Sequence, residues 1–472
     1  MKLKVRPSDF KVTERLADGI VSDQGPFRVY RVRKEKLTSL EAATELANAV
    51  GVPSGEIGLA GLKDRQGVTT QFMSARHGPP LSINLPGLSI QNAGFAGANL
   101  DASASEGNDF QIVARDLSDG DIDQIRGSLD AVRTHGLPNY FDSQRFGNIR
   151  HGQGWIALDL LKGDVKGALQ RLVASASPFE PPAKRRLKDA LWRSFGDWGA
   201  CRSIAGKLGR YHSVFEHLRR DPEDYAGAFH RVATRERLIH LYAFQSHLFN
   251  RALALHVAEA CPDRFGVQGI EGKLRFPTGE TWLPDAWDGQ LMLPGERLQG
   301  VDDPDQRALY GRILEMLGIE PDGLVLPDVP GFQLKPEPRA ACVVPLELRV
   351  RPAEDDNEFR GRRMVKLQFG LPRGSYATLV VRRLVGPGTH SSYRPDSQAQ
   401  HPQRDEGEGQ GYGGPRRSSR VRRGASRRGG SGGARSSRRG RGGGSSRGFG
   451  GGSSRGSAGG GGSRRRGSGR RR

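Results

Sequence analysis

Residues 61–67 of the chain read Gly-Leu-Lys-Asp-Arg-Gln-Gly, and Asp64 is the residue among them best suited to chemistry. Lys63 and Arg65 flank this aspartate, so we expect its pKa to be lowered and its carboxylate to be ionised at neutral pH. An ionised carboxylate serves as a nucleophile or as a general base. From spacing alone, an aspartate that closes a hairpin turn is the commoner explanation.

Strands are predicted on both sides of this loop. Residues 56–60, apolar apart from Glu56, are short enough for a buried strand, and residues 69–74, which mix polar and apolar residues, are predicted to form a half-buried strand. Upstream, residues 27–34 alternate apolar and basic residues, which indicates a solvated edge strand or a strand that faces phosphates. Thr38 and Glu41 form a capping box that predicts a helix ending at Gly51. The apolar face predicted for that helix consists of Leu40, Ala43, Ala47 and Val50.

The run Gly-Leu-Lys-Asp at residues 61–64 resembles the signature of the TruD family of pseudouridine synthases. In that family, the aspartate of this run is the catalytic residue. Five other segments resemble family motifs in the family's order, namely residues 4–10, 107–110, 136–147, 244–250 and 371–378. A single glycine-rich run is weak evidence, whereas six motifs in register are specific. The resemblance covers roughly residues 4–385.

The resemblance also implies roles for further side chains. Phe10 is expected to line the uridine pocket, Asn108 to contact the substrate near Asp64, Phe110 to stack on the target base, and Tyr376 to lie beside the target uridine. Taken alone, Phe10 and Phe110 are ordinary core phenylalanines of predicted strands. Stacking on an aromatic ring contributes about 1–3 kcal/mol per base, enough to hold a base that has left its stack.

Three cations complete the predicted substrate-binding set, namely Lys4, Lys63 and Arg145. Arg145 is expected to pair with the catalytic carboxylate or with a phosphate, and an ordinary surface salt bridge fits the sequence equally well.

The sequence departs from the family's pattern at two places. Asp142 stands where glycine is usual, and we expect this carboxylate to point away from bound RNA. Residues 99–106 hold no lysine or arginine and carry the acids Asp101 and Glu106, where the family usually has several cations. The resemblance therefore does not extend to this phosphate-binding strip of the family.

The predicted fold class is α+β, with a pseudouridine-synthase-like catalytic domain built on a mixed or antiparallel sheet. We assign residues 1–150 and 339–386 to this domain and residues 151–338 to an inserted α+β TRUD domain. Helical spacing is clear over residues 154–208 and in a long helix over 236–260, stopped by Pro262. Residues 378–381 are expected to form a strand. Histidines 240 and 247 in the long helix are expected to pack or to be solvated, not to bind metal.

Residues 387–472 differ in composition and are predicted to be a disordered, RGG-like basic tail. The last 62 residues, 411–472, hold 19 arginines and no acidic residue, which leaves 54 basic against 52 acidic residues elsewhere. The net charge of +21 therefore describes the tail, and an RNA surface on the folded part must be a local patch. RNA binding by charge and arginine stacking is the favoured role of the tail, with a solubilising role as the alternative.

Three scattered cysteines fit a reducing cytoplasm, and no apolar run is long enough for a membrane span. The sequence thus predicts a cytoplasmic monomer that isomerises uridine to pseudouridine in RNA, with uridine 13 of tRNA as the expected target. Neither a metal nor an organic cofactor is expected. The alternative is a non-catalytic RNA-binding protein or chaperone that uses the arginine-rich tail on a synthase-like fold. A phosphate-loop NTPase is excluded because the Gly-x-x-x-x-Gly-Lys-Ser/Thr run is missing.

Overall fold

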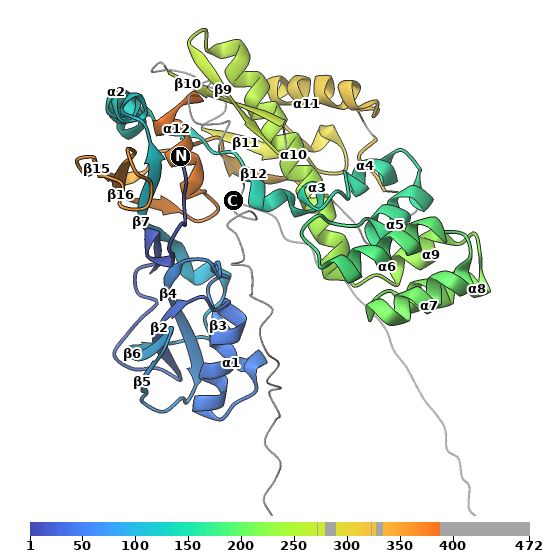
Figure 1. Ribbon diagram of the computed structural model, residues 1–472, viewed down its shortest axis with the longest axis horizontal. Coiled ribbons are helices and arrows are strands. Elements are labelled where there is room, and N and C mark those ends of the chain that lie inside the picture. Colours follow the sequence, from blue (N-terminus) through green and yellow to red (C-terminus); the bar gives the residue numbers. More distant parts are fainter. Residues whose placement is uncertain (271, 279–288, 322, 327–333, 388–472) are drawn as a thin grey trace, which may run out of the picture. The chain divides into compact units, whose positions relative to one another are not determined.

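The computed structural model describes residues 1–270, 272–278, 289–321, 323–326 and 334–387, and its fold is α+β with a mixed sheet, as predicted (Figure 1). Apart from Pro387, the tail predicted to be disordered lies outside the described residues. The main sheet consists of β1 (Phe10–Leu16), β2 (Phe27–Glu35), β3 (Gly58–Leu59), β4 (Val68–Arg76), β5 (Ser82–Leu85), β6 (Leu88–Ala96), β7 (Ser105–Leu117), β14 (Leu346–Val350), β15 (Glu354–Asp355) and β16 (Arg363–Pro372).

Within the described residues these ten strands run in the order β14-β16-β7-β1-β4-β2-β6-β5, with β15 beside β16 and β3 beside β4. Strand β1 is antiparallel to β7, where Val12 lies opposite Phe110, and β7 is antiparallel to β16, where Phe110 lies opposite Phe369. Strands β1 and β4 are parallel. Since side chains alternate along a strand, Phe10 and Glu14 lie on the same buried face of β1 as Val12.

The first helix, α1 (Ser39–Val50), begins and ends as the sequence predicts. Thr38 accepts from the backbone of Glu41 in a capping box, and Gly51 adopts a left-handed φ of 78° at the C-terminal end. The predicted apolar face is partly wrong. Leu40 is 56% exposed, while Leu46, which was not predicted, is completely buried. Capping fixes where the helix starts, but its burial depends on the neighbouring strands.

The strand predicted over residues 378–381 is wrong. These residues belong to helix α12 (Ala377–Val385), which packs against α2 (Asp119–His135). Every residue of α12 is buried, including Arg382 and Arg383, so no exposed polar face marks the helical period. Without a polar face to reveal the period, a short apolar run is compatible with a strand or a helix.

Between β8 (Leu137–Pro138) and β13 (Cys342–Val343), which pair with each other, the described chain is mostly helical. The long helix α10 (Thr234–Ala260) starts two residues before its predicted position. The other helices are α3 (Gly147–Arg150), α4 (Ile156–Leu161), α5 (Val165–Ala174), α6 (Pro182–Arg193), α7 (Trp198–Leu208), α8 (His212–Arg220), α9 (Tyr225–His230) and α11 (Pro304–Leu317). Helices α5 to α9 lie side by side (Figure 1).

Two small antiparallel two-stranded sheets complete this region, β9 (Arg264–Gly269) with β10 (Gly272–Pro277) and β11 (Gln290–Leu293) with β12 (Glu337–Ala340). The short 3-10 turns are η1 (Pro7–Asp9), η2 (Ser54–Glu56), η3 (Ala102–Ala104), η4 (Ser143–Phe146) and η6 (Leu298–Gly300). Strand β12 crosses residue 338, where the inserted domain is predicted to end. The domain boundaries stay a prediction.

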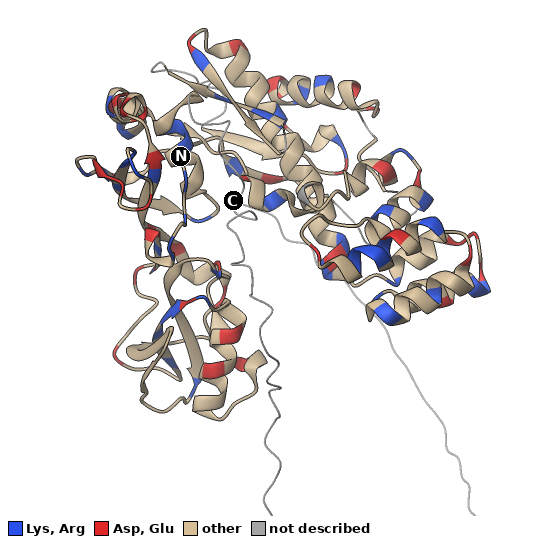
Figure 2. Cartoon of the chain, in the orientation of Figure 1, with Lys and Arg blue, Asp and Glu red and all other residues tan. Residues whose placement is uncertain are grey.

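Both signs of charge are spread over the described chain, as Figure 2 shows. No helix in the described ranges is long and apolar enough to cross a membrane. The same residues include no group of three or more His, Cys, Asp or Glu side chains that could hold a metal ion.

Candidate active site

Asp64 lies in the loop that joins β3 to β4, and its side chain is 47% exposed. The predicted strand before this loop is short, because only Gly58 and Leu59 pair with β4. The strand after the loop is present over the predicted residues. The loop therefore leaves the sheet beside β4 and carries a carboxylate that solvent reaches.

Two side chains contact the same oxygen of Asp64. The Lys4 ammonium lies 3.3 Å from Oδ2, and the Gln144 amide donates to Oδ2 at 2.9 Å. Burial alone would raise the pKa of Asp64, but the charge of Lys4 and the hydrogen bond from Gln144 outweigh it and lower the pKa. The carboxylate is thus ionised at neutral pH.

The pKa of Asp64 is lowered, as predicted, but the predicted cause of this shift is wrong. The Lys63 ammonium does not lie on Asp64; it donates to Oε1 of Glu14 at 2.6 Å, and the Glu14 side chain is fully buried. Arg65 donates to the carbonyl of Lys36 at 2.9 Å. Both flanking cations are thus held by other acceptors, and the charge that lowers the pKa of Asp64 comes from Lys4.

Lys4 and Phe10 reach the site together from the N-terminal segment. Lys4 is buried, has a left-handed φ of 56°, and places its ammonium 4.5 Å from the centre of the Phe10 ring. Phe10 contacts Phe110 edge-on, with 6.2 Å between the ring centres, and Phe110 stacks on Phe369, with 5.6 Å between the ring centres. Phe10 and Phe110 are only 6% and 8% exposed. A continuous chain of contacts therefore runs from Asp64 through Lys4 to the aromatic core.

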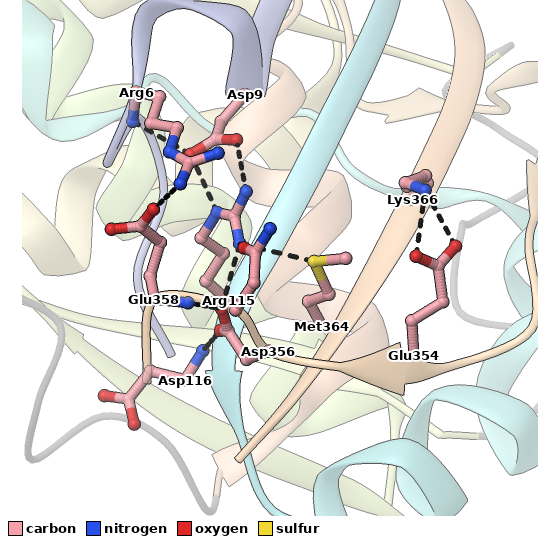
Figure 3. Close-up of polar contacts among 10 residues, drawn as sticks. Arg6, Asp9, Arg115, Asp116, Glu354, Asp356, Glu358, Met364 and Lys366 are labelled. Atoms are coloured by element: carbon pink, nitrogen blue, oxygen red, sulfur yellow. Dashed lines mark hydrogen bonds and ion pairs between the residues drawn. The ribbon is translucent and has the colours of Figure 1, made fainter. Parts of the chain in front are cut away.

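A buried ion network holds the N-terminal segment in place (Figure 3). Arg115 of β7 donates to both carboxylate oxygens of Asp9 at 2.9 Å, and to Asp356 at 2.9 Å. Asp9 in turn accepts from the backbone of Arg6 at 2.9 Å. All three charged partners of the central contacts are buried, so the segment between Lys4 and Phe10 is fixed against β7.

Asn108 occupies the strand position two residues before Phe110 and so faces the same side of β7. It lies opposite Glu14 on β1 and Leu371 on β16. Its Oδ1 atom is buried and has no hydrogen-bond partner among the described residues. A buried acceptor without a donor is costly, which makes this oxygen a candidate for a substrate contact.

A second group of side chains surrounds Phe141, next to Gln144. Arg145 donates to Oγ of Ser246 at 3.0 Å and lies 5.5 Å above the Phe141 ring, so it pairs with neither Asp64 nor another carboxylate in the described contacts. Tyr376, at the start of α12, contacts Phe141 edge-on at 6.3 Å. Burial raises the pKa of Tyr376.

Arg339 fastens this second group and was not predicted from the sequence. Its guanidinium lies 3.9 Å from the centre of the Phe141 ring and donates to the carbonyl of Asn139 and to that of Gly374. Gly374 has a left-handed φ of 83°, which explains the glycine in the turn before Tyr376. Arg339 thus ties two segments that are more than 200 residues apart.

Asp142, expected to point away from RNA, is in fact buried inside the protein. Its Oδ1 lies 3.2 Å from Arg382, and its Oδ2 accepts from the Thr378 hydroxyl at 2.7 Å. The departure from glycine at this position is therefore a buried link between the segment of Gln144 and helix α12.

The structure places Lys4, Phe10 and Phe110 in one group that reaches Asp64, and Arg145 and Tyr376 in a second group joined through Phe141. Lys63 supports the loop through Glu14. Gln144, which links the second group to Asp64, was missed although it lies in the recognised run over residues 136–147. The polar residues of that run were the available signal for a partner of Asp64, but the sequence does not tell which of them faces the carboxylate.

The family model described as tRNA pseudouridine synthase D (TruD) matches residues 1–269. The tRNA pseudouridine synthase D of Leptospira interrogans is 26% identical over 393 residues, which cover 81% of this chain and 95% of the relative. The tRNA pseudouridine synthase D of Geobacter sulfurreducens is 29% identical over 396 residues, covering 81% of this chain and 93% of the relative.

The fold is shared with the crystal structure of a protein described as tRNA pseudouridine synthase D from Methanosarcina mazei. The TM-score is 0.64 at 21% identity, and the match covers 81% of this chain and 93% of the other. With the family model matching more than half of its length, the chain belongs to the TruD family of tRNA pseudouridine synthases. These proteins are isomerases, so the predicted family and class of enzyme are confirmed.

Proposed function

We propose that this chain converts uridine 13 of tRNA to pseudouridine and that Asp64 is the catalytic nucleophile or base. The observation that carries the proposal is the state of the Asp64 carboxylate, which is half exposed, ionised, and held at one oxygen by Lys4 and Gln144. The other oxygen, Oδ1, takes no part in these two contacts. That oxygen is the one we assign to the ribose of the target nucleotide.

The proposed reaction is an isomerisation. The N1–C1′ bond of uridine breaks, the detached uracil turns within the site, and a C5–C1′ bond forms. The proton that C5 loses is balanced by the proton that N1 gains, so no atom enters or leaves the nucleoside. Asp64 either attacks the ribose and is later displaced, or it removes and returns a ribose proton.

The remaining predicted residues are proposed to hold the nucleotide during that turn. Phe10 and Phe110 form the apolar floor next to Lys4, and the Oδ1 atom of Asn108 accepts a hydrogen bond from the base. Tyr376 is proposed to cover the base from the second group, and Arg145 to hold a phosphate. A base that has left its helix must be held in this way if it is to turn without escaping.

We further propose that residues 1–150 and 339–386 form the catalytic domain and residues 151–338 the inserted TRUD domain. Both groups that meet at Asp64 come from the first and third of these ranges, except for the support that Ser246 gives to Arg145. Family membership favours the enzyme over the alternative of a non-catalytic RNA-binding protein. A cytoplasmic monomer without a cofactor stays a prediction.

The proposal is tested with Asp64→Asn, which keeps the shape of the side chain and removes its charge. Unmodified tRNA is incubated with each protein, and pseudouridine is located by carbodiimide modification and primer extension. We expect a stop at position 13 with the unchanged chain and none with Asp64→Asn, although both bind tRNA. If Asp64→Asn modified tRNA at the unchanged rate, Asp64 would have no catalytic role and the proposal would be wrong.

Asp109→Asn is the matched control. Asp109 is also a half-exposed aspartate near a cation, Arg15, but it lies on the opposite face of β7 from Phe110. The Asp109→Asn variant should modify tRNA at the unchanged rate.

A substrate with deuterium at the ribose C2′ position separates the two mechanisms proposed for Asp64. Removal of the C2′ proton gives a primary isotope effect, and direct attack on the ribose does not.

A further inference from the structure

Lys34 is a fully buried lysine directly beneath the loop that carries Asp64. It lies near the end of β2, a strand hydrogen-bonded on both sides, and none of its surface is exposed. Its ammonium donates to the backbone carbonyls of Leu37 at 2.8 Å, Lys63 at 3.3 Å and Asp64 at 2.8 Å. Two of its three acceptors therefore belong to the loop itself, and one is the carbonyl of Asp64.

A second contact holds the same loop through the backbone amide of Lys63. The amide of Lys63 donates to the hydroxyl of Ser39 at 2.8 Å, and that hydroxyl donates to Gln71 at 2.7 Å. Ser39 begins α1, and Gln71 belongs to β4. The main chain at residues 63 and 64 is thus fixed by one donor and one acceptor that come from regular elements of the fold.

Packing alone does not explain a lysine at this place. Burial of an ammonium in a protein interior is unfavourable unless its protons are all donated, and an apolar side chain would fill the space at lower cost. What the ammonium supplies is three donors that diverge from one atom, and three carbonyls converge on it here. An arginine fork is planar and does not reproduce this arrangement.

We propose that Lys34 is a positioning residue for the reaction, because its ammonium fixes the main chain of Lys63 and Asp64 and so sets where the Asp64 carboxylate stands relative to Lys4 and Gln144. Lys34 does not touch the substrate in this proposal. It rests on the proposed role of Asp64, since a fixed loop matters for catalysis only if this carboxylate does the chemistry. Small misplacements of a catalytic group cost up to about 100-fold in rate.

The test compares three variants of the full-length chain. Lys34→Met removes the ammonium and keeps most of the volume, and Ser39→Ala removes the second anchor without entering the space under the loop. Lys188→Met is the matched control. Lys188 lies in α6, is also buried, and donates to the backbone carbonyl of Ser175 at 3.0 Å. For each variant we measure the single-turnover rate with saturating enzyme, tRNA affinity, the melting temperature and hydrogen exchange of the Lys63 amide.

We expect Lys34→Met to react about 10- to 100-fold more slowly, with unchanged tRNA affinity and with faster exchange of the Lys63 amide. Ser39→Ala should shift the rate and the exchange in the same direction, while Lys188→Met should change neither, even if its melting temperature falls. If the folded fraction of Lys34→Met and of Ser39→Ala reacts at the unchanged rate, the residues are merely structural and the inference is overturned.

The two proposals fail in different ways. Full activity of Asp64→Asn would overturn the role of Asp64, whereas the exchange of the Lys63 amide in Lys34→Met reports on the anchor whatever group does the chemistry. Slow reaction of Lys34→Met without faster exchange would show that Lys34 acts by another route, and the inference would again be overturned.

Discussion

Gln144 and Asp64 lie 80 residues apart in the chain, yet the amide of Gln144 donates to Oδ2 of Asp64 at 2.9 Å. The contact joins the loop after β3 to the turn η4, and it leaves Oδ2 occupied by two donors once Lys4 is counted. A carboxylate held at one oxygen presents the other in a defined direction, which is what attack or proton removal requires.

Gln144→Leu should therefore slow the reaction and move its pH dependence. The hydrogen bond from Gln144 lowers the pKa of Asp64, so its loss raises that pKa and shifts the acidic limb of the pH–rate profile to higher pH. We expect a rate about 10- to 100-fold lower at neutral pH, since a hydrogen bond to a charged group contributes roughly 1.5–3 kcal/mol. Single-turnover rates across the acidic range provide the measurement. An unmoved acidic limb would contradict this account.

The buried ammonium of Lys34 predicts a second, alkaline limb. Burial lowers the pKa of Lys34 from 10.5 to about 8, while Asp64 and Glu41 raise it and Lys63 lowers it further. Above that pH the amine has two protons for three carbonyls, so activity should fall as the pH rises through about 8. Pre-steady-state rates from pH 7 to 10 test the expectation, and in Lys34→Met this limb should be missing.

Unfolding does not produce the same limb through this group. The folded protein releases the proton of Lys34 at lower pH than the unfolded chain, which therefore binds more protons between about 8 and 10.5. Through this group the free energy of unfolding rises with pH in that interval. A loss of activity without a loss of stability would thus point to the anchor. A parallel fall of both would contradict its assignment to Lys34.

The network around Arg115 should be among the most sensitive points of the fold. Arg115→Met leaves the buried carboxylates of Asp9 and Asp356 without their common partner, so we expect the free energy of unfolding to fall by about 3–5 kcal/mol. Urea denaturation is the measurement. Arg126→Met, which breaks an exposed pair with Asp123, should cost at most about 0.5 kcal/mol. Equal losses in the two variants would show that burial of the network is unimportant.

The arginine-rich tail should add affinity for RNA without choosing the uridine. A chain that ends at Gln410 loses 19 arginines, so its tRNA affinity should fall in low salt and depend less steeply on salt concentration. Filter binding at several salt concentrations and pseudouridine mapping measure the two effects. Replacement of the tail arginines by lysines keeps the charge and separates it from arginine stacking. A change of modified position would contradict an electrostatic role.

Several elements of the fold can be predicted from local sequence patterns. The capping box at Thr38, the stop at Gly51 and the strand over residues 69–74 each depend on a few neighbouring residues, and each is confirmed. Residues 378–381 were assigned to a strand because helix α12 is buried all round and shows no period. Leu40 was placed on the wrong face because the sequence does not reveal which neighbours cover a helix.

The site was predictable at the level of motifs and not of contacts. The motifs named Asp64, Lys4 and Phe10 as candidates, and in the structure Lys4 contacts both Asp64 and Phe10. The side chains that hold Asp64 could not be read from its neighbours in sequence. Lys63 donates to Glu14 instead, and the partners of Asp64 are Lys4 and Gln144, both far away in sequence. Direction of a side chain within a loop depends on the whole fold.

The pairing of β7 with β16 bears on how the protein is made. The ribosome completes β7 long before β16, so one edge of β7 stays unpaired by β16 while residues 118–362 are synthesised. An open strand edge invites wrong pairing, and the delay is set by the length of the intervening chain. A nascent chain that stops before residue 363 already holds Lys4, Asp64 and Gln144, yet it lacks the strand that lies against Phe110. The sheet around Phe110 can therefore be completed only after Pro372 has been synthesised.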